Sequence, residues 1–182
     1  EMDFDAADSL PLDAEPFAAA LDVLLSFLLA EGNRRSIVEL LSSPHFRFSQ
    51  AVPPAAIAAL DELLQDLKYA GGWERLASIA ASAESAGSDT TSRKRRASLW
   101  RRAAPALAAA AAAALALEGA RLGDSASAQL SALLAFIRSN ERLVPEEAPW
   151  GARHLRARAA VLAAAEALLE AHARHDDKPL PV

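Results

Sequence analysis

The sequence contains no cysteine and few aromatic residues. The absence of cysteine excludes disulfide bonds, thiolate metal sites and a cysteine nucleophile. Only 5% of the residues are aromatic, and much of the 52% hydrophobic content is alanine, which buries little area per residue. We therefore expect helices that approach one another closely through small side chains. Leucine then supplies most of the hydrophobic stabilisation, at about 25 cal/mol per Å² buried.

Motifs for catalysis and phosphate binding are also absent. The sequence has no G-x-x-x-x-G-K-S/T phosphate loop, no G-x-G-x-x-G, no G-x-S-x-G elbow and no H-E-x-x-H. An ATPase, dehydrogenase or hydrolase that works on its own is therefore not expected. No catalytic residue and no cofactor is predicted for this segment.

A targeting or membrane segment is not evident either. The first five residues are acidic where a signal peptide would be basic. The longest apolar run, 103–117, is interrupted by Pro105 and is too short and too alanine-rich to span a bilayer comfortably. We expect a cytoplasmic protein with no membrane role. The start on Glu1 and the Pro-Leu-Pro-Val end suggest a segment of a larger protein.

Apolar residues recur at helical spacing along most of the sequence, without an alternating strand pattern or a repeat of fixed period. This predicts an all-α fold, an irregular bundle of about six to eight helices in a single domain, 1–182. Proline, glycine and capping residues predict the helix limits. In the first part of the sequence we expect a helix from Phe17 to a stop at Gly32-Asn33, a short helix that ends before Pro44, a helix from Pro53-Pro54 to Gly71-Gly72, and a helix over 73–83. In the second part we expect a helix over about 95–122 with a kink or restart at Pro105, a helix capped by Asp124-Ser125, and a last helix over about 152–175.

Four stretches are expected outside the helices. Residues 1–16 are acidic and predict an extended lead-in, and 85–93 are small and polar and predict a flexible loop. Residues 45–48 form a short loop with alternating aromatics, and 144–151 form a connector.

The strongest charge feature is a cluster of six of the 19 basic residues within ten positions. Such a cluster can neutralise phosphates, and the neighbouring Trp100 offers a stacking plane for a base. The start of a helix is a poor place for cations unless an anion offsets them. The alternative to a binding site is a solvated helix start beside a flexible loop. A second basic strip, Arg153, Arg156 and Arg158, could extend the cluster. The candidate nucleic-acid contacts are Arg93, Lys94, Arg95, Arg96, Trp100, Arg101 and Arg102.

The histidines offer a weaker possibility of a metal site. His172 and His175 lie on one helix face, and Asp176 and Asp177 follow at once. Cationic histidines at the negative end of a helix dipole, followed by solvated acids, explain this pattern more simply. No metal site is predicted, and His45 and His154 are expected to be isolated packing or surface residues.

Two segments resemble parts of a known family. Residues 35–48, Arg-Ser-Ile-Val-Glu-Leu-Leu-Ser-Ser-Pro-His-Phe-Arg-Phe, resemble the helix followed by Ser-Pro-x-Phe in the helical insertion of UvrD/Rep-type motor domains. The version in AddB-like and RecC-like proteins, whose helicase fold is often degenerate and lies beside a PD-(D/E)XK nuclease domain, is the relevant one. Residues 154–162 and 171–179 look like the last helix of the same insertion.

The resemblance brackets 35–179 and implies a non-catalytic module of a DNA double-strand-break repair helicase/nuclease. The family's ATP-binding residues and nuclease carboxylates match nothing in this sequence. The module would position duplex or forked DNA through its phosphates, or pack against motor and nuclease domains of the parent chain or a partner subunit. The alternative is a helical adaptor without a DNA role, whose groove receives a partner helix. Its expected exposed aromatics are Phe46, Phe48, Trp73 and Trp150.

Overall fold

The computed structural model describes residues 15–83, 91–122, 125–145 and 147–180, and the side chains at 83, 91–95 and 122 are outside this description. Eight helices form the described parts, and the only pairing of extended backbone there is an isolated bridge between Phe46 and Glu141. The expected all-α irregular bundle is therefore confirmed. The helices are α1 (Pro16–Leu29), α2 (Arg34–Ser42), α3 (Pro54–Asp66), α4 (Trp73–Ala83), α5 (Thr91–Ala116), α6 (Glu118–Leu122), α7 (Ala126–Asn140) and α8 (Gly151–Arg174).

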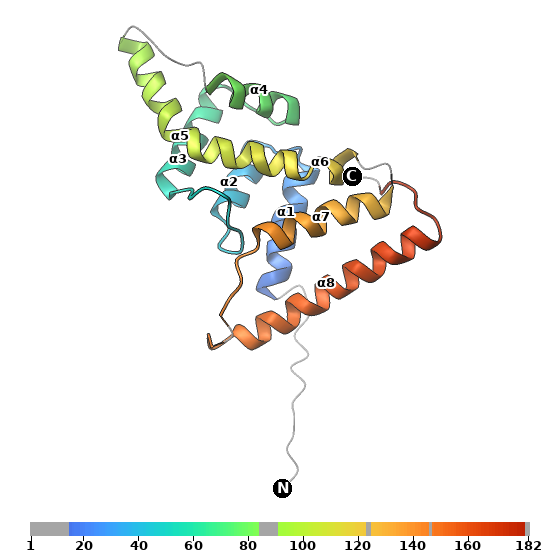
Figure 1. The fold of residues 1–182 in the computed structure, drawn as a ribbon. Helices are drawn as coiled ribbons and strands as arrows, with labels where there is room; N and C mark the ends of the chain where they lie inside the picture. Colours follow the sequence, from blue (N-terminus) through green and yellow to red (C-terminus); the bar gives the residue numbers. More distant parts are fainter. Residues whose placement is uncertain (1–14, 84–90, 123–124, 146, 181–182) are drawn as a thin grey trace.

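The helices pack in two groups (Figure 1). In one group α5 lies against α2, α3 and α4, and in the other α7 lies between α6 and α8. Helix α1 contacts α2 and α8, and α5 contacts α6 and α7, so both helices connect the two groups. None of the helices in the described residues is long and apolar enough to cross a membrane.

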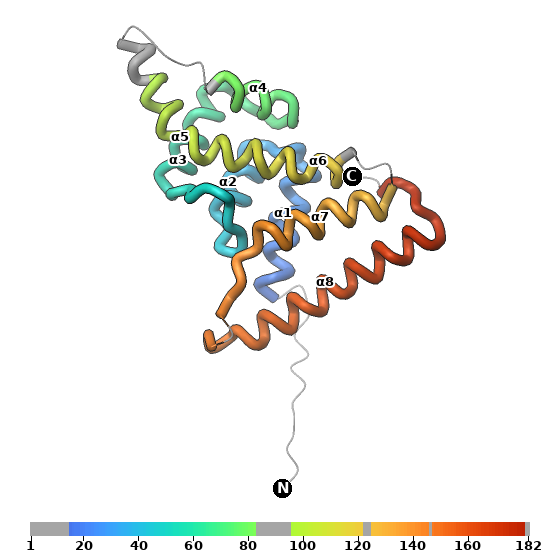
Figure 2. The backbone as a smooth tube through the Cα atoms, viewed as in Figure 1, coloured from blue at the N-terminus to red at the C-terminus, as the bar shows by residue number. Residues whose placement is uncertain are grey.

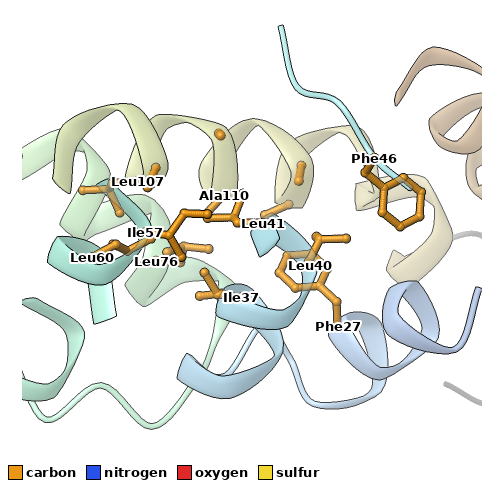
Figure 3. Packing of buried hydrophobic residues seen from close by; sticks show 14 of the residues in the cluster. Phe27, Ile37, Leu40, Leu41, Phe46, Ile57, Leu60, Leu76, Leu107 and Ala110 are labelled. Atoms are coloured by element: carbon orange, nitrogen blue, oxygen red, sulfur yellow. The ribbon is translucent and has the colours of Figure 1, made fainter. Parts of the chain in front are cut away.

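Leucine, isoleucine and phenylalanine fill the centre of the first group (Figure 3). Phe27, Ile37, Leu40, Leu60 and Leu76 are each fully buried there. Helix α5 closes over them with a stripe of small residues at helical spacing, as expected from the alanine content. The buried residues of that stripe are Ala103, Ala106, Leu107, Ala109, Ala110, Ala113 and Ala114, and the buried Leu117 follows the end of the helix.

Several predicted limits are confirmed by the structure. Asn33 caps α2 by accepting a hydrogen bond from the backbone N–H of Ser36 at 2.9 Å, and α2 ends before Pro44. Helix α4 has the predicted bounds. The hydroxyl of Ser125 accepts from the N–H of Ala128 and caps α7, whereas Asp124 lies outside the described residues.

The predicted end of α3 at Gly71-Gly72 is wrong. The helix ends at Asp66, because Lys68 adopts a left-handed backbone conformation with φ of 50°. The following residue, Tyr69, is buried, so a tertiary contact sets this helix end.

Helix α5 differs in its limits from the predicted 95–122. It begins at Thr91, runs through Pro105 without a restart and ends at Ala116, and α6 follows separately. The helix changes direction along its length, as the tube in Figure 2 shows, which fits a proline inside a helix. Of the predicted loop 85–93, residues 85–90 lie outside the description and the last three belong to α5.

The end of the chain returns to the start of α7 (Figure 1). Asp177 accepts hydrogen bonds from the backbone N–H of Ser127 at 2.8 Å and from its hydroxyl at 2.6 Å. Leu180 and Gln129 exchange two further hydrogen bonds, which involve the Leu180 backbone and the Gln129 amide. These contacts fix the segment after α8 against the bundle. Of the predicted lead-in 1–16, residues 1–14 lie outside the description and Pro16 already begins α1.

Candidate functional site

The basic cluster lies on the first half of α5. The side chains of Arg93, Lys94 and Arg95 are outside the description, although their backbone is helical. Arg96 and Arg101 are exposed. The first turn of α5 contains no acidic residue. The positive end of the helix dipole therefore adds to the positive side chains, an arrangement that an anion would stabilise.

Arg102 is the exception within the cluster, because it has a partner. Its guanidinium lies 3.4 Å from the carboxylate of Glu62 on α3, and both side chains are largely exposed. An exposed pair of this kind contributes little stability, so phosphate could replace Glu62 at small cost.

Trp100 does not offer the expected stacking plane. Its side chain is only 9% exposed and belongs to the hydrophobic core, beside Leu99 and Ala103. A ring in the core cannot stack on a base without partial unfolding. The spacing of Trp100 with Ala103 and Leu107 was a signal for this burial, because positions three and seven apart share one helix face.

The second basic strip, on α8, does not extend the cluster. Arg153 binds Glu15 at the start of α1 through Nε at 2.8 Å and a terminal nitrogen at 2.7 Å. Arg158 binds Glu141 through two nitrogens, and this hydrogen bonding raises the pKa of Arg158. These two arginines hold α8 to the rest of the bundle, and only Arg156 of the strip is exposed.

Two histidines that are far apart in the sequence meet beside these ion pairs. The rings of His45 and His154 are parallel to within 10°, with centroids 6.1 Å apart. His154 is 3% exposed, and its Nδ1 has no hydrogen-bond partner among the described residues. Phe17 and Trp150 contact its ring edge-on. The expectation that both histidines are isolated is therefore wrong, and no local pattern could have revealed a pair 109 positions apart.

Burial is the main cause that lowers the pKa of His45, and His154 lowers it further. A cavity of about 10 Å³ beside the two rings, which Glu141 and Arg142 also line, has room for a single water molecule. Backbone hydrogen bonds of 2.7 Å, from Arg47 N–H to Asn140 and from Arg142 N–H to His45, close this region. The two rings therefore pack the 45–47 segment against the start of α8.

A groove of about 570 Å³ lies on the other side of Phe46. It runs between α2, the 43–52 segment and the start of α3, and Arg47 and Arg142 stand exposed at its edge. The expected exposed aromatics are found only in part. Phe46 is 4% exposed, contrary to expectation, whereas Phe48 and Trp73 are half-buried and Trp150 is 49% exposed. The apolar lining includes Val38, Leu41, Phe46, Phe48, Val52 and Ile57.

Three of the four residues considered as metal ligands have separate side-chain partners. Asp177 binds Ser127, which lowers the pKa of the Asp177 carboxyl, and Asp176 pairs with Lys178 at 2.9 Å. His172 faces the backbone carbonyl of Asp176 through Nδ1 at 3.3 Å. In the part of the chain that the structure describes, no three His, Asp or Glu side chains are grouped to hold a metal ion.

The candidate surfaces are therefore the start of α5 and the groove beside Phe46. Comparison of the chain with protein-family models, curated proteins and solved structures finds no match in any of the three.

Proposed function

We propose that this chain is a non-catalytic helical module that contacts DNA through its phosphates with the basic first half of α5. The observation that carries the proposal is the exposure of Arg96 and Arg101 on a helix whose first turn has no acidic residue. The resemblance of residues 35–48 and 154–179 to AddB-like helical insertions gives the context, a machine for the repair of DNA double-strand breaks.

The burial of Trp100 supports one mode of binding over another. Proteins that hold single strands combine cationic grooves with aromatic platforms for the bases. Here the neighbouring aromatic ring is in the core, so only the electrostatic contribution remains. Contacts of arginine with phosphate carry no sequence information, and we expect binding to duplex DNA without sequence preference.

The test is binding of the 182-residue chain to a fluorescein-labelled 30-base-pair duplex, followed by anisotropy between 50 and 200 mM NaCl. If about four phosphates are neutralised, the logarithm of the binding constant falls with the logarithm of salt concentration with a slope of about −3.6. Affinity then drops about 150-fold over this range. An unlabelled duplex of a different sequence competes equally well.

A pair of arginine variants locates the contact. Arg96→Ala with Arg101→Ala reduces the steepness of the salt dependence by about 1.8, because two phosphate contacts are lost. Arg35→Ala with Arg156→Ala removes the same charge from exposed positions on α2 and α8 and leaves the slope unchanged. Equal losses in both double variants, or no binding at tens of micromolar protein in 50 mM salt, would refute the proposal.

A helical adaptor is the second candidate function, and the groove beside Phe46 favours it. A partner helix would place apolar side chains against Val38 and Val52. Ala58→Arg, at an exposed position in the lining, would then block the partner and leave DNA binding unchanged.

A further inference from the structure

The excess negative charge of the chain is confined to its first 14 residues. The sequence has 24 acidic and 19 basic residues, and five of the acids precede Glu15, so 19 acids balance 19 bases in 15–182. The same 14 residues contain no base, and Met2, Phe4 and Leu10 are interspersed among the acids. These residues lie outside the part of the chain that the structure describes. The five acids are Glu1, Asp3, Asp5, Asp8 and Asp13.

The groove beside Phe46 has positive charge that complements the acids of residues 1–14. Its exposed arginines, Arg47 and Arg142, form no ion pair with the described residues. The one acid in the lining, Asp61, lies 3.5 Å from the guanidinium of Arg34. The lining between these charges presents polar and apolar surface in similar amounts. The groove therefore suits a peptide that carries carboxylates as well as apolar side chains.

The start of α1 lies close to this groove. Phe17 and Phe46 line the same small cavity, and Phe46 also lines the groove. A segment of 14 residues can extend up to about 46 Å from its attachment. Residues 1–14 are therefore tethered within reach of the groove.

We propose that the segment 1–14 binds in the groove, with its carboxylates at Arg47 and Arg142 and its apolar side chains on the lining between them. Covalent attachment through a segment of this length gives an effective concentration in the millimolar range. A site too weak to hold a separate peptide is then still occupied by the attached segment.

The absence of native cysteine allows a direct test by disulfide trapping. Ser9→Cys is combined with a second cysteine at Ala51, which is exposed in the groove lining, or at Ala152, which is exposed on α8 beside Arg153. Because Arg153 binds Glu15, position 152 is close to the attachment of the segment. A bound segment forms the disulfide at position 51 about tenfold faster than at 152 under mild oxidation, by non-reducing gel and mass spectrometry. Equal rates, or a faster reaction at 152, would overturn the proposal.

A third pairing tests the other cationic surface. If the acidic segment binds the start of α5 instead, Ser9→Cys reacts fastest with Arg101→Cys, and the proposal fails. The contribution of the groove arginines is tested with Arg142→Glu, which lowers the rate of disulfide formation at position 51 to the rate at position 152. Arg156→Glu makes the same charge change at an exposed position on α8 and leaves the rate at 51 unaltered. Circular dichroism establishes that each variant is folded.

A measurement without cysteines completes the test. Deletion of residues 1–14 shifts the backbone amide resonances of Ala51 and Ala58, which line the groove, and leaves those of α8 beyond Leu162 in place. Unchanged resonances at both groove positions would contradict the proposal. DNA binding by the same deletion variant is measured in parallel, so that failure of the α5 contact and failure of the groove contact are distinguishable.

Discussion

Tyr69 is the only tyrosine of the chain and joins two connections between helices. Its side chain is 5% exposed. Its hydroxyl lies 2.9 Å from the carbonyl oxygen of Gly32, in the α1–α2 turn, and 3.2 Å from that of Gly72, before α4. The N–H of Gly72 in turn donates to the carbonyl of Glu31 at 2.9 Å. Removal of this hydroxyl therefore affects three helices at once.

Ionisation of the same hydroxyl is strongly disfavoured in the folded chain. Burial raises the pKa of Tyr69 to about 12 from 10, with Arg75 opposing the shift and Glu31 adding to it. Above pH 10 the unfolded chain loses this proton while the folded chain keeps it, so the unfolded state binds fewer protons. The free energy of unfolding consequently falls as pH rises from 10 to 12, by up to about 2.7 kcal/mol for two pKa units.

Absorbance at 295 nm follows the one tyrosine without interference from others. We expect a midpoint near 12 in the folded chain and near 10 in guanidinium chloride, with circular dichroism recorded at each pH to verify the fold. Tyr69→Phe lowers the free energy of unfolding at pH 8 by about 1 to 2 kcal/mol, because buried carbonyls lose their donor. The variant also loses the additional decline between pH 10 and 12. A titration midpoint near 10 in the folded wild-type chain would refute the reasoning.

Two further predictions concern the histidine pair and the α1–α2 turn. The lowered pKa of His45 means that the unfolded chain takes up this proton first, so the free energy of unfolding in urea falls as pH drops from 7.5 to 5. His45→Gln reduces that dependence, and parallel pH profiles for wild type and variant would contradict it. Gly32→Ala places a Cβ 2.7 Å from Cζ3 of Trp73 at a φ of 58°, and we expect a loss of about 2 to 3 kcal/mol in thermal or urea unfolding. When Gly32→Ala is made in a Trp73→Ala background, only the backbone strain of about 1 kcal/mol remains. An equal loss of stability in both backgrounds would therefore exclude a clash between the new Cβ and the Trp73 ring.

Periodicity and helix-breaking residues predicted the helices of the described residues except α6, which was merged with α5. The bounds of α4 and the end of α2 before Pro44 follow from local signals, because proline and glycine restrict or free the backbone wherever they occur. The end of α3 could not be predicted in this way. Lys68 adopts a left-handed conformation that lysine does not favour by itself, and the burial of Tyr69 beside it comes from the tertiary fold.

The candidate site was predictable only where it depends on one helix. Charge density along the sequence located the basic start of α5, and helical spacing was enough to place Trp100 inward, although its chemistry suggested an exposed role. The histidine pair and the groove arise from segments that meet only in the folded chain. His45 comes from the segment after α2 and His154 from the first turns of α8, so the two rings meet only through the tertiary fold.

The position of Trp100 also bears on how the basic residues are presented. Leu99, Trp100 and Ala103 are buried, so they anchor α5 immediately around Arg101 and Arg102. The backbone at these two arginines is therefore held by the core, and little backbone entropy remains to be lost when an anion binds. In the proposed DNA contact, the buried Trp100 would act as a positioning residue for Arg101 and Arg102. Arg101 and Arg102 thus face solvent from the same stretch of α5 whose aromatic ring faces the core.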